Sequence, residues 1–362
     1  MKKVSTLIFA ILFVSAYTCA HSRKAIRGDV YPVNSSNLGY SFRLNDNDFH
    51  YLFGEREVHL DSLYGRKGVS INRAAVGRED SWITMIDFIP GRCMAVDQTP
   101  SYLYVVIEES FGRHGGPPWV QKLYKVNKST GEAIELYEWG GGLSHVWSVH
   151  FDSDDVGYMF YLPTGNSRDS QLMKTKNGGL DWNFVNIHRS IQSPKSYDKL
   201  FFMSYKRNVK NWIYSIDKES NVLDSVYFDL VLKDFAIDED NAYWLLGESK
   251  NKSILRYHHD GVDSVVKVFS ENENFTPDKL LKFNEAMVVT GHTIDQSLLF
   301  GFGGTRPSMY VSKNNGLTWI EVDLQNTWTL DAVSLYKDEK VLANLRYPRR
   351  ESILIFNLNN SQ

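Results

Sequence analysis

The sequence has 362 residues, with 43 acidic and 40 basic side chains and a formal net charge of −3. Because this near balance provides no basic field for a phosphate backbone, we expect no nucleic-acid partner. Two cysteines in so long a chain exclude a fold held together by several disulfides, and the 14% aromatic content favours strands over helices.

The first twenty residues, MKKVSTLIFAILFVSAYTCA, have the pattern of a secretory leader. Two lysines precede an apolar run that is too short to span a bilayer, and small residues follow. We expect a signal peptide at 1–20, with a second cleavage site after Ala16, and one mature domain at 21–362. In the alternative, Cys19 carries a lipid, although the residues before it match a lipobox poorly. The predicted location is the periplasm, either soluble or lipid-anchored to the outer membrane, with no transmembrane segment.

Beyond the leader, short apolar segments alternate with turns rich in Gly, Asn, Asp and Ser. Clear examples are VGYMFYL at 156–162, NAYWLLG at 241–247 and SILIFNL at 352–358. No window keeps a helical spacing of apolar residues for long. Many short strands separated by turn residues predict an all-β protein, and the length favours a closed architecture over a small sandwich.

Pairs of apolar strands joined by a polar turn recur along the chain, beginning near positions 146, 231, 279 and 329. Four strands for each 40–50 residues, roughly, are typical of a β-propeller blade. The mature length predicts a single propeller of about seven four-stranded blades, with six or eight as alternatives. The first blade, placed at 50–95, is the least regular.

The last repeat, from 328, holds only three strands. A strand from the N-terminal part of the domain is therefore expected to complete it and to remove an exposed sheet edge. The candidate closing strands are YSFRL at 40–44 and FHYLFGEREVHL at 49–60.

Two octapeptides, TKNGGLDW at 175–182 and SKNNGLTW at 312–319, share one layout of polar residues, glycine and tryptophan. The matched positions are Thr175, Asn177, Gly179, Asp181 and Trp182 in the first, and Ser312, Asn314, Gly316, Thr318 and Trp319 in the second. The Asn side chain can bond its own turn, Gly permits a positive φ, and Trp fills space between sheets. These residues are predicted to be structural.

The octapeptides resemble the Asp-box, or BNR repeat, of the propellers of sialidases, sortilin-type receptors and photosystem II assembly factors. The resemblance implies a turn between the third and fourth strands of a blade, although Asn stands here where the family prefers Asp. For a sialidase it would also imply three arginines that grip a carboxylate, a tyrosine nucleophile and an acidic partner. The arginines nearest to the family positions are Arg43 and Arg306.

No cluster of residues predicts a metal or cofactor site. His145 and His150 are five apart and point to opposite sides of one strand, so they cannot converge on zinc. The acidic turns at 152–155 and 238–241 are interpreted as solvated, with weak Ca²⁺ binding as the alternative. No convergent catalytic constellation is visible, so we do not predict an enzyme.

Long loops provide the remaining functional signal, because propellers present ligands on loops. Candidate partner-binding residues on them are Phe111, Arg113, His114, Trp119, Arg168 and Arg306. Arginine, tyrosine and tryptophan on these loops favour an exported protein-binding propeller. Small exported propellers without catalytic residues resemble immunity or inhibitor proteins that neutralise a toxin in the periplasm. The alternatives are a sialidase-like glycoside hydrolase and an envelope assembly or scaffolding factor.

Overall fold

The computed structural model describes residues 29–32, 38–58, 66–78, 81–110, 119–139, 145–162, 171–185, 191–204, 211–238, 240, 242–250, 252–269, 275–295, 304–322, 324, 329–336, 340–347 and 350–358. The regular elements in these ranges are strands, β1 to β28. The same ranges contain no helix with the length and apolar character needed to cross a bilayer.

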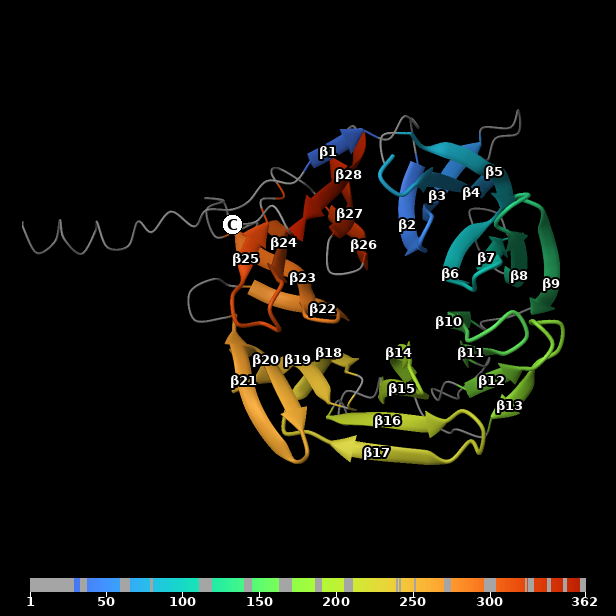
Figure 1. Cartoon of the computed structure of the whole chain (residues 1–362). Coiled ribbons are helices and arrows are strands. Elements are labelled where there is room, and N and C mark those ends of the chain that lie inside the picture. The colour runs from blue at the N-terminus through green and yellow to red at the C-terminus, as the bar shows by residue number, and fades with distance from the viewer. Residues whose placement is uncertain are drawn as a thin grey trace, which may run out of the picture.

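The strands form seven antiparallel four-stranded sheets arranged as the blades of a ring (Figure 1). Blade 1 consists of β2 (Leu38–Asn45), β3 (Phe49–Val58), β4 (Arg66–Ala75) and β5 (Ile83–Pro90). Blade 2 consists of β6 (Arg92–Gln98), β7 (Tyr102–Ser110), β8 (Trp119–Asn127) and β9 (Ala133–Trp139). Blade 3 consists of β10 (His145–Phe151), β11 (Gly157–Leu162), β12 (Gln171–Thr175) and β13 (Asn183–Val185).

Blade 4 consists of β14 (Ile191–Ser196), β15 (Lys199–Ser204), β16 (Trp212–Asp217) and β17 (Leu223–Tyr227). Blade 5 consists of β18 (Val231–Ile237), β19 (Tyr243–Ser249), β20 (Lys252–His259) and β21 (Val262–Val268). Blade 6 consists of β22 (Phe275–Phe283), β23 (Ala286–Asp295), β24 (Gly304–Ser312) and β25 (Ile320–Val322). In each blade the first strand lies nearest the centre of the ring. The all-β fold and the number of blades confirm the sequence prediction.

Blade 7 closes the ring with strands from both ends of the chain. β26 (Thr329–Tyr336), β27 (Lys340–Tyr347) and β28 (Arg350–Asn357) are followed at the outer edge by β1 (Asp29–Pro32), which is antiparallel to β28 (Figure 1). Pro32 suits this outer edge because proline has no backbone N–H with which to form a hydrogen bond to a further strand. Closure by an N-terminal strand is therefore confirmed.

The choice of the closing strand was wrong, because both stretches proposed for it belong to blade 1. Residues 40–44 lie in β2 and 49–58 form β3, and the two strands pair as a hairpin. The Asp46 carboxylate makes the turn between them by accepting the backbone N–H groups of Asp48 and Phe49, at 2.9 and 2.7 Å. Blade 1 consequently begins at Leu38 and not near residue 50.

The core lies between the blades. Each apolar cluster of the described residues combines side chains from two neighbouring sheets, because successive residues of a strand point to opposite faces. In the cluster between blades 2 and 3, Tyr104 stacks on Phe151 with ring centroids 3.4 Å apart. Cys93, a buried free thiol, lies in the cluster between blades 1 and 2. Each blade thus depends on its neighbours for its hydrophobic burial.

The two ends of the ring differ in their connections. At the turn face, the first strand of a blade joins the second and the third joins the fourth through short turns. At the opposite end, the loop face, the second strand joins the third and each blade leads to the next. The segments 111–118 and 163–170, which in the sequence separate β7 from β8 and β11 from β12, lie outside the described residues.

Both octapeptides lie where the sequence places them, between the third and fourth strands of blades 3 and 6. In blade 3 the Thr175 hydroxyl accepts the N–H of Gly179 at 3.0 Å, and the Asn177 amide oxygen accepts the N–H of Asp181 at 3.0 Å. The Trp182 indole N–H donates to the carbonyl of Gly179 at 3.0 Å. Gly179 has a φ of +97°, which favours glycine.

The octapeptide of blade 6 repeats this network. The Ser312 hydroxyl accepts the N–H of Gly316 at 2.9 Å, and the Asn314 amide oxygen accepts the N–H of Thr318 at 2.9 Å. The Trp319 indole N–H donates to the carbonyl of Gly316 at 2.8 Å. We call 175–182 and 312–319 the tryptophan turns. In both turns these side chains bond the backbone of their own turn.

Candidate functional site

A cavity of about 580 Å³ opens at the turn-face end of the central channel. Six of the seven blades contribute to its lining, blade 3 being the exception. The lining residues are Leu44, Asn45, Asp46, Asn47, Gln98, Lys195, Tyr197, Ala236, Leu280, Leu281, Lys282, Phe283, Val333 and Ser334. A cavity assembled from so many blades is fixed by the ring itself and is thus pre-formed.

Two aromatic side chains are exposed at the rim of this channel mouth. Tyr197 is 38% exposed and Phe283 is 43% exposed, while Leu280 at its base is fully buried. The ring of Tyr197 packs edge-on against Phe201 with centroids 6.0 Å apart, and its hydroxyl accepts the N–H of Ile237 at 3.2 Å. An aromatic ring held by such contacts, as Tyr197 is, provides contact area at low entropic cost, which suits binding.

The lysines of the mouth are paired with carboxylates of neighbouring blades. The Lys195 ammonium of blade 4 is 3.3 Å from Asp234 of blade 5, and the Lys282 ammonium of blade 6 is 2.7 Å from Asp238 of blade 5. Asp238 also accepts the indole N–H of Trp244 at 2.8 Å. The cations of the mouth therefore hold blades together, and little positive charge is left for an anionic ligand.

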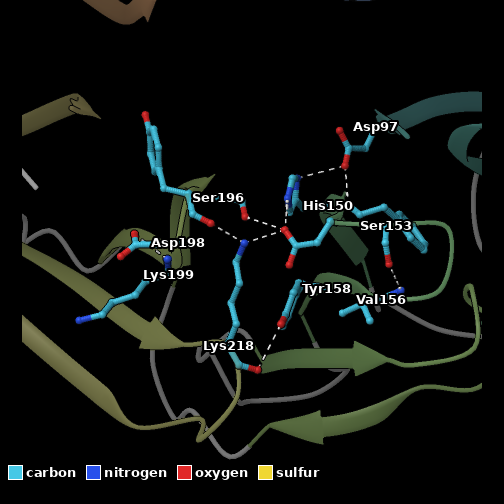
Figure 2. Close-up of polar contacts among 12 residues, drawn as sticks. Asp97, His150, Ser153, Val156, Tyr158, Ser196, Asp198, Lys199 and Lys218 are labelled. Carbon is cyan, nitrogen blue, oxygen red and sulfur yellow. Dashed lines mark hydrogen bonds and ion pairs between the residues drawn. The ribbon is translucent and has the colours of Figure 1, made fainter. Parts of the chain in front are cut away.

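Beside the mouth, a polar cluster joins the inner strands of blades 2, 3 and 4 (Figure 2). His150 of β10 is central: its Nδ1 is 3.1 Å from Asp97 Oδ2 and its Nε2 is 3.0 Å from Asp152 Oδ1. Asp152 Oδ1 also accepts the Ser196 hydroxyl at 3.1 Å and the Lys218 ammonium at 2.6 Å. Lys218 donates further to the carbonyl of Tyr197 at 2.5 Å.

The charges of this cluster stabilise one another. Burial opposes the charged imidazolium, but the hydrogen bonds that His150 donates to Asp152 and Asp97 outweigh it and raise the pKa of His150 to about 9. Burial likewise opposes the charged form of Asp152, and the bonds from His150 and Lys218 lower the pKa of its carboxyl to about 2. At neutral pH His150 is therefore an imidazolium and Asp152 a carboxylate.

This arrangement limits the chemistry of His150. With a proton on each ring nitrogen and a carboxylate facing each, the imidazole has no free lone pair to bind a metal or to remove a proton. No group of three or more His, Cys, Asp or Glu side chains in the described ranges is placed to hold a metal ion. The cluster is therefore a clamp between blades, and it makes the surface around it rigid.

Blades 1 and 2 are joined by a clamp of the same design. The buried ammonium of Lys128 is 2.8 Å from Asp46 Oδ2 and 3.0 Å from Gln98 Oε1. Lys128 and Lys218 hold the second place in the equivalent turns NKSTGE (127–132) and DKESNV (217–222), which we call the lysine turns. Each turn is organised by its first residue, since Asn127 accepts the N–H of Ser129 at 2.9 Å and Asp217 that of Ser220 at 2.7 Å.

The sequence interpretation missed these clamps. It took the acidic turns at 152–155 and 238–241 to be solvated, whereas Asp152 and Asp238 are bound by lysines of the next blade. Asp154 likewise accepts the hydroxyl of Thr99 in blade 2. The available signal was the repeated lysine of the lysine turns.

The partner-binding residues chosen from the sequence are not gathered by the described structure. Phe111, Arg113, His114 and Arg168 lie outside the described residues. Trp119 begins β8, paired with Ser110, and Arg306 is an exposed residue of β24 opposite Thr293. Cys19 and the leader also lie outside the described residues. No arginine is among the described residues that line the channel mouth.

No protein-family model matches the sequence, and a search of curated proteins finds no match. Among solved structures, YCF48 bound to D1 peptide superposes with a TM-score of 0.59 and 9% identity over 94% of this chain and 98% of that one. The GH74 enzyme of Niastella koreensis gives a TM-score of 0.54 and 12% identity over 91% of this chain and 53% of that one.

A structure from a study of two prolyl endopeptidases gives a TM-score of 0.55 and 9% identity over 85% of this chain and 46% of that one. This chain thus spans about half the length of the latter two proteins. At these identities the likeness establishes the β-propeller fold and nothing finer.

Proposed function

We propose that this protein is a non-enzymatic β-propeller that binds a protein partner. The observation that carries the proposal is the channel mouth, where the rings of Tyr197 and Phe283 are exposed. The lysines of the mouth form ion pairs with a neighbouring blade and make the framework rigid. The likeness to YCF48 supports it, because that propeller covers nearly the whole of this chain and was solved bound to a peptide.

The finer proposal is an exported immunity protein that neutralises a toxin in the periplasm. It is supported by the leader pattern of residues 1–20. It is also supported by His150, whose two ring nitrogens both face carboxylates and are not available for catalysis. We further propose that the two tryptophan turns are degenerate Asp-boxes, supported by the identical hydrogen bonds of Thr175 and Ser312 to their glycines.

The test is a pull-down from the native host with the tagged mature chain, followed by mass spectrometry. A stoichiometric partner that stops growth when expressed alone in the periplasm, and no longer does so beside this chain, is the expected result. Envelope-machine subunits as the partners would contradict the toxin proposal and favour an assembly factor. If no partner is captured, the binding proposal fails, and hydrolysis of a fluorogenic sialoside then tests the glycoside hydrolase alternative.

A further inference from the structure

On the turn face, the turns of blades 3 and 4 carry exposed apolar and acidic side chains, and we call this surface the blade 3–4 patch. Its exposed apolar members are Leu180, Tyr197, Val222 and Leu223, and its exposed acidic members are Asp155, Asp181, Asp198 and Glu219. Exposed apolar side chains with charged residues around them mark interaction sites on soluble proteins.

The patch is held together by contacts described above and by one more. The Asp155 carbonyl accepts the N–H of Gly178 at 2.7 Å, which ties the two turns of blade 3 to each other. Lys218 then joins Asp152 of blade 3 to Tyr197 of blade 4 (Figure 2). A surface fixed in this way loses little conformational entropy when a partner binds.

The charge of the patch selects the kind of partner. Of its lysines, Lys218 is only 18% exposed and faces Asp152, Lys199 is half-buried, and Lys176 is exposed. The four exposed acids outnumber the one exposed lysine, so the surface has a negative field around the apolar side chains. Such a surface repels nucleic acid and anionic membranes and attracts a basic protein surface.

We infer that the blade 3–4 patch is the docking surface for a protein partner whose contact region combines lysine or arginine with leucine or aromatic side chains. This inference rests on the proposed protein-binding function and adds to it the face that is used and the chemistry of the partner. Leu180 and Tyr197 are the apolar anchors, and Asp155 and Glu219 provide charge complementarity at the rim.

Blade 6 supplies a matched control. Leu317 occupies the same place in its tryptophan turn as Leu180 and is 83% exposed, compared with 56% for Leu180. The Glu285 carbonyl accepts the N–H of Asn315 at 2.9 Å, just as the Asp155 carbonyl accepts that of Gly178. The double variants Asp155→Lys/Leu180→Asp and Glu285→Lys/Leu317→Asp thus make the same chemical change in equivalent turns, and neither alters a side chain that bonds its own turn.

The test pans a phage-displayed library of random peptides against the full chain and measures binding of the enriched peptides by interferometry. We expect peptides that carry Lys or Arg beside Leu or aromatic residues, with affinity lowered about tenfold or more by Asp155→Lys/Leu180→Asp and unchanged by the blade 6 variant. Circular dichroism of both variants checks that the fold is retained.

Enrichment of acidic peptides, equal losses with both double variants, or no enrichment would overturn the inference. The pull-down distinguishes this failure from that of the proposed function. A partner captured equally well by the native chain and by both double variants leaves the binding function standing and removes the patch from it.

Discussion

The tryptophan turns and the lysine turns occupy the same place in their blades and solve one problem in two ways. Each connects the third strand to the fourth, and each must secure its blade to the preceding one. Trp182 lies in the apolar cluster between blades 2 and 3, with its ring 6.1 Å from that of Phe151. Lys128 instead crosses to Asp46 of the preceding blade. One turn fills a gap, and the other forms a charged bridge.

The difference shows how a propeller can have irregular repeats and still close. The tryptophan turn needs a glycine, because a Cβ on Gly179 would lie 3.0 Å from Leu123 of blade 2. The lysine turn needs a carboxylate on the preceding blade, and Asp46 and Asp152 provide it. Either device fixes the spacing of neighbouring sheets, so the ring is regular although the sequence of its turns is not.

The largest effect in this comparison is expected from removing a tryptophan. Trp182→Ala should lower the free energy of unfolding by about 3–5 kcal/mol, because a large aromatic ring leaves a cavity in the core between blades. Trp319→Ala should cost less, since Trp319 is only partly buried in its cluster. Urea denaturation followed by circular dichroism measures both, and an equal loss would contradict the difference in burial.

Breaking a clamp should have the next largest effect. Lys128→Met leaves the partly buried Asp46 carboxylate without its cation and should cost about 2 kcal/mol. Lys218→Met should cost about 1 kcal/mol, because Asp152 keeps its bonds from His150 and Ser196. The same denaturation experiment ranks the two, and the reverse order would show that the His150 contacts do not compensate.

The clamp at His150 predicts a pH dependence. Since folding raises the pKa of His150 from 6.5 to about 9, its contribution is fully present below the unfolded pKa and is lost as the pH rises through about 9. We expect the native chain to lose about 1–2 kcal/mol of stability between about pH 7 and pH 10, after allowance for solvent screening. Urea midpoints across this range measure it. His150→Gln should flatten the profile, and an unchanged slope in that variant would assign the effect to other groups.

The smallest expected effect separates the two tryptophan turns. Asn177 donates its side-chain N–H to the Asp181 carboxylate at 2.9 Å, whereas Asn314 donates to the hydroxyl of Thr318 at 2.9 Å. Asn177→Asp should therefore cost about 1 kcal/mol at neutral pH, since it sets two carboxylates against each other. Asn314→Asp should be nearly neutral, because the Thr318 hydroxyl can donate to the new carboxylate. Thermal melts test this pair, and equal shifts would contradict it.

The fold was largely predictable because its signals are local. The strand-and-turn rhythm indicated the blades, and the layout of Thr175 to Trp182 placed its turn between two particular strands. The closing strand was not predictable, since the four residues of β1 are too few to show any periodicity. The clamps were not predictable for another reason. Lys128 and Asp46 are 82 residues apart in the sequence, and only the closed ring brings them together.

Hydrogen–deuterium exchange of the full chain, with and without the partner obtained from the pull-down, tests the central claim most directly. The account predicts slower exchange in the turns of blades 3 and 4, at 152–156, 176–182, 197–199 and 218–222, with the turn at 313–319 unchanged. Protection confined to the loop face, or protection spread equally over both tryptophan turns, would contradict it.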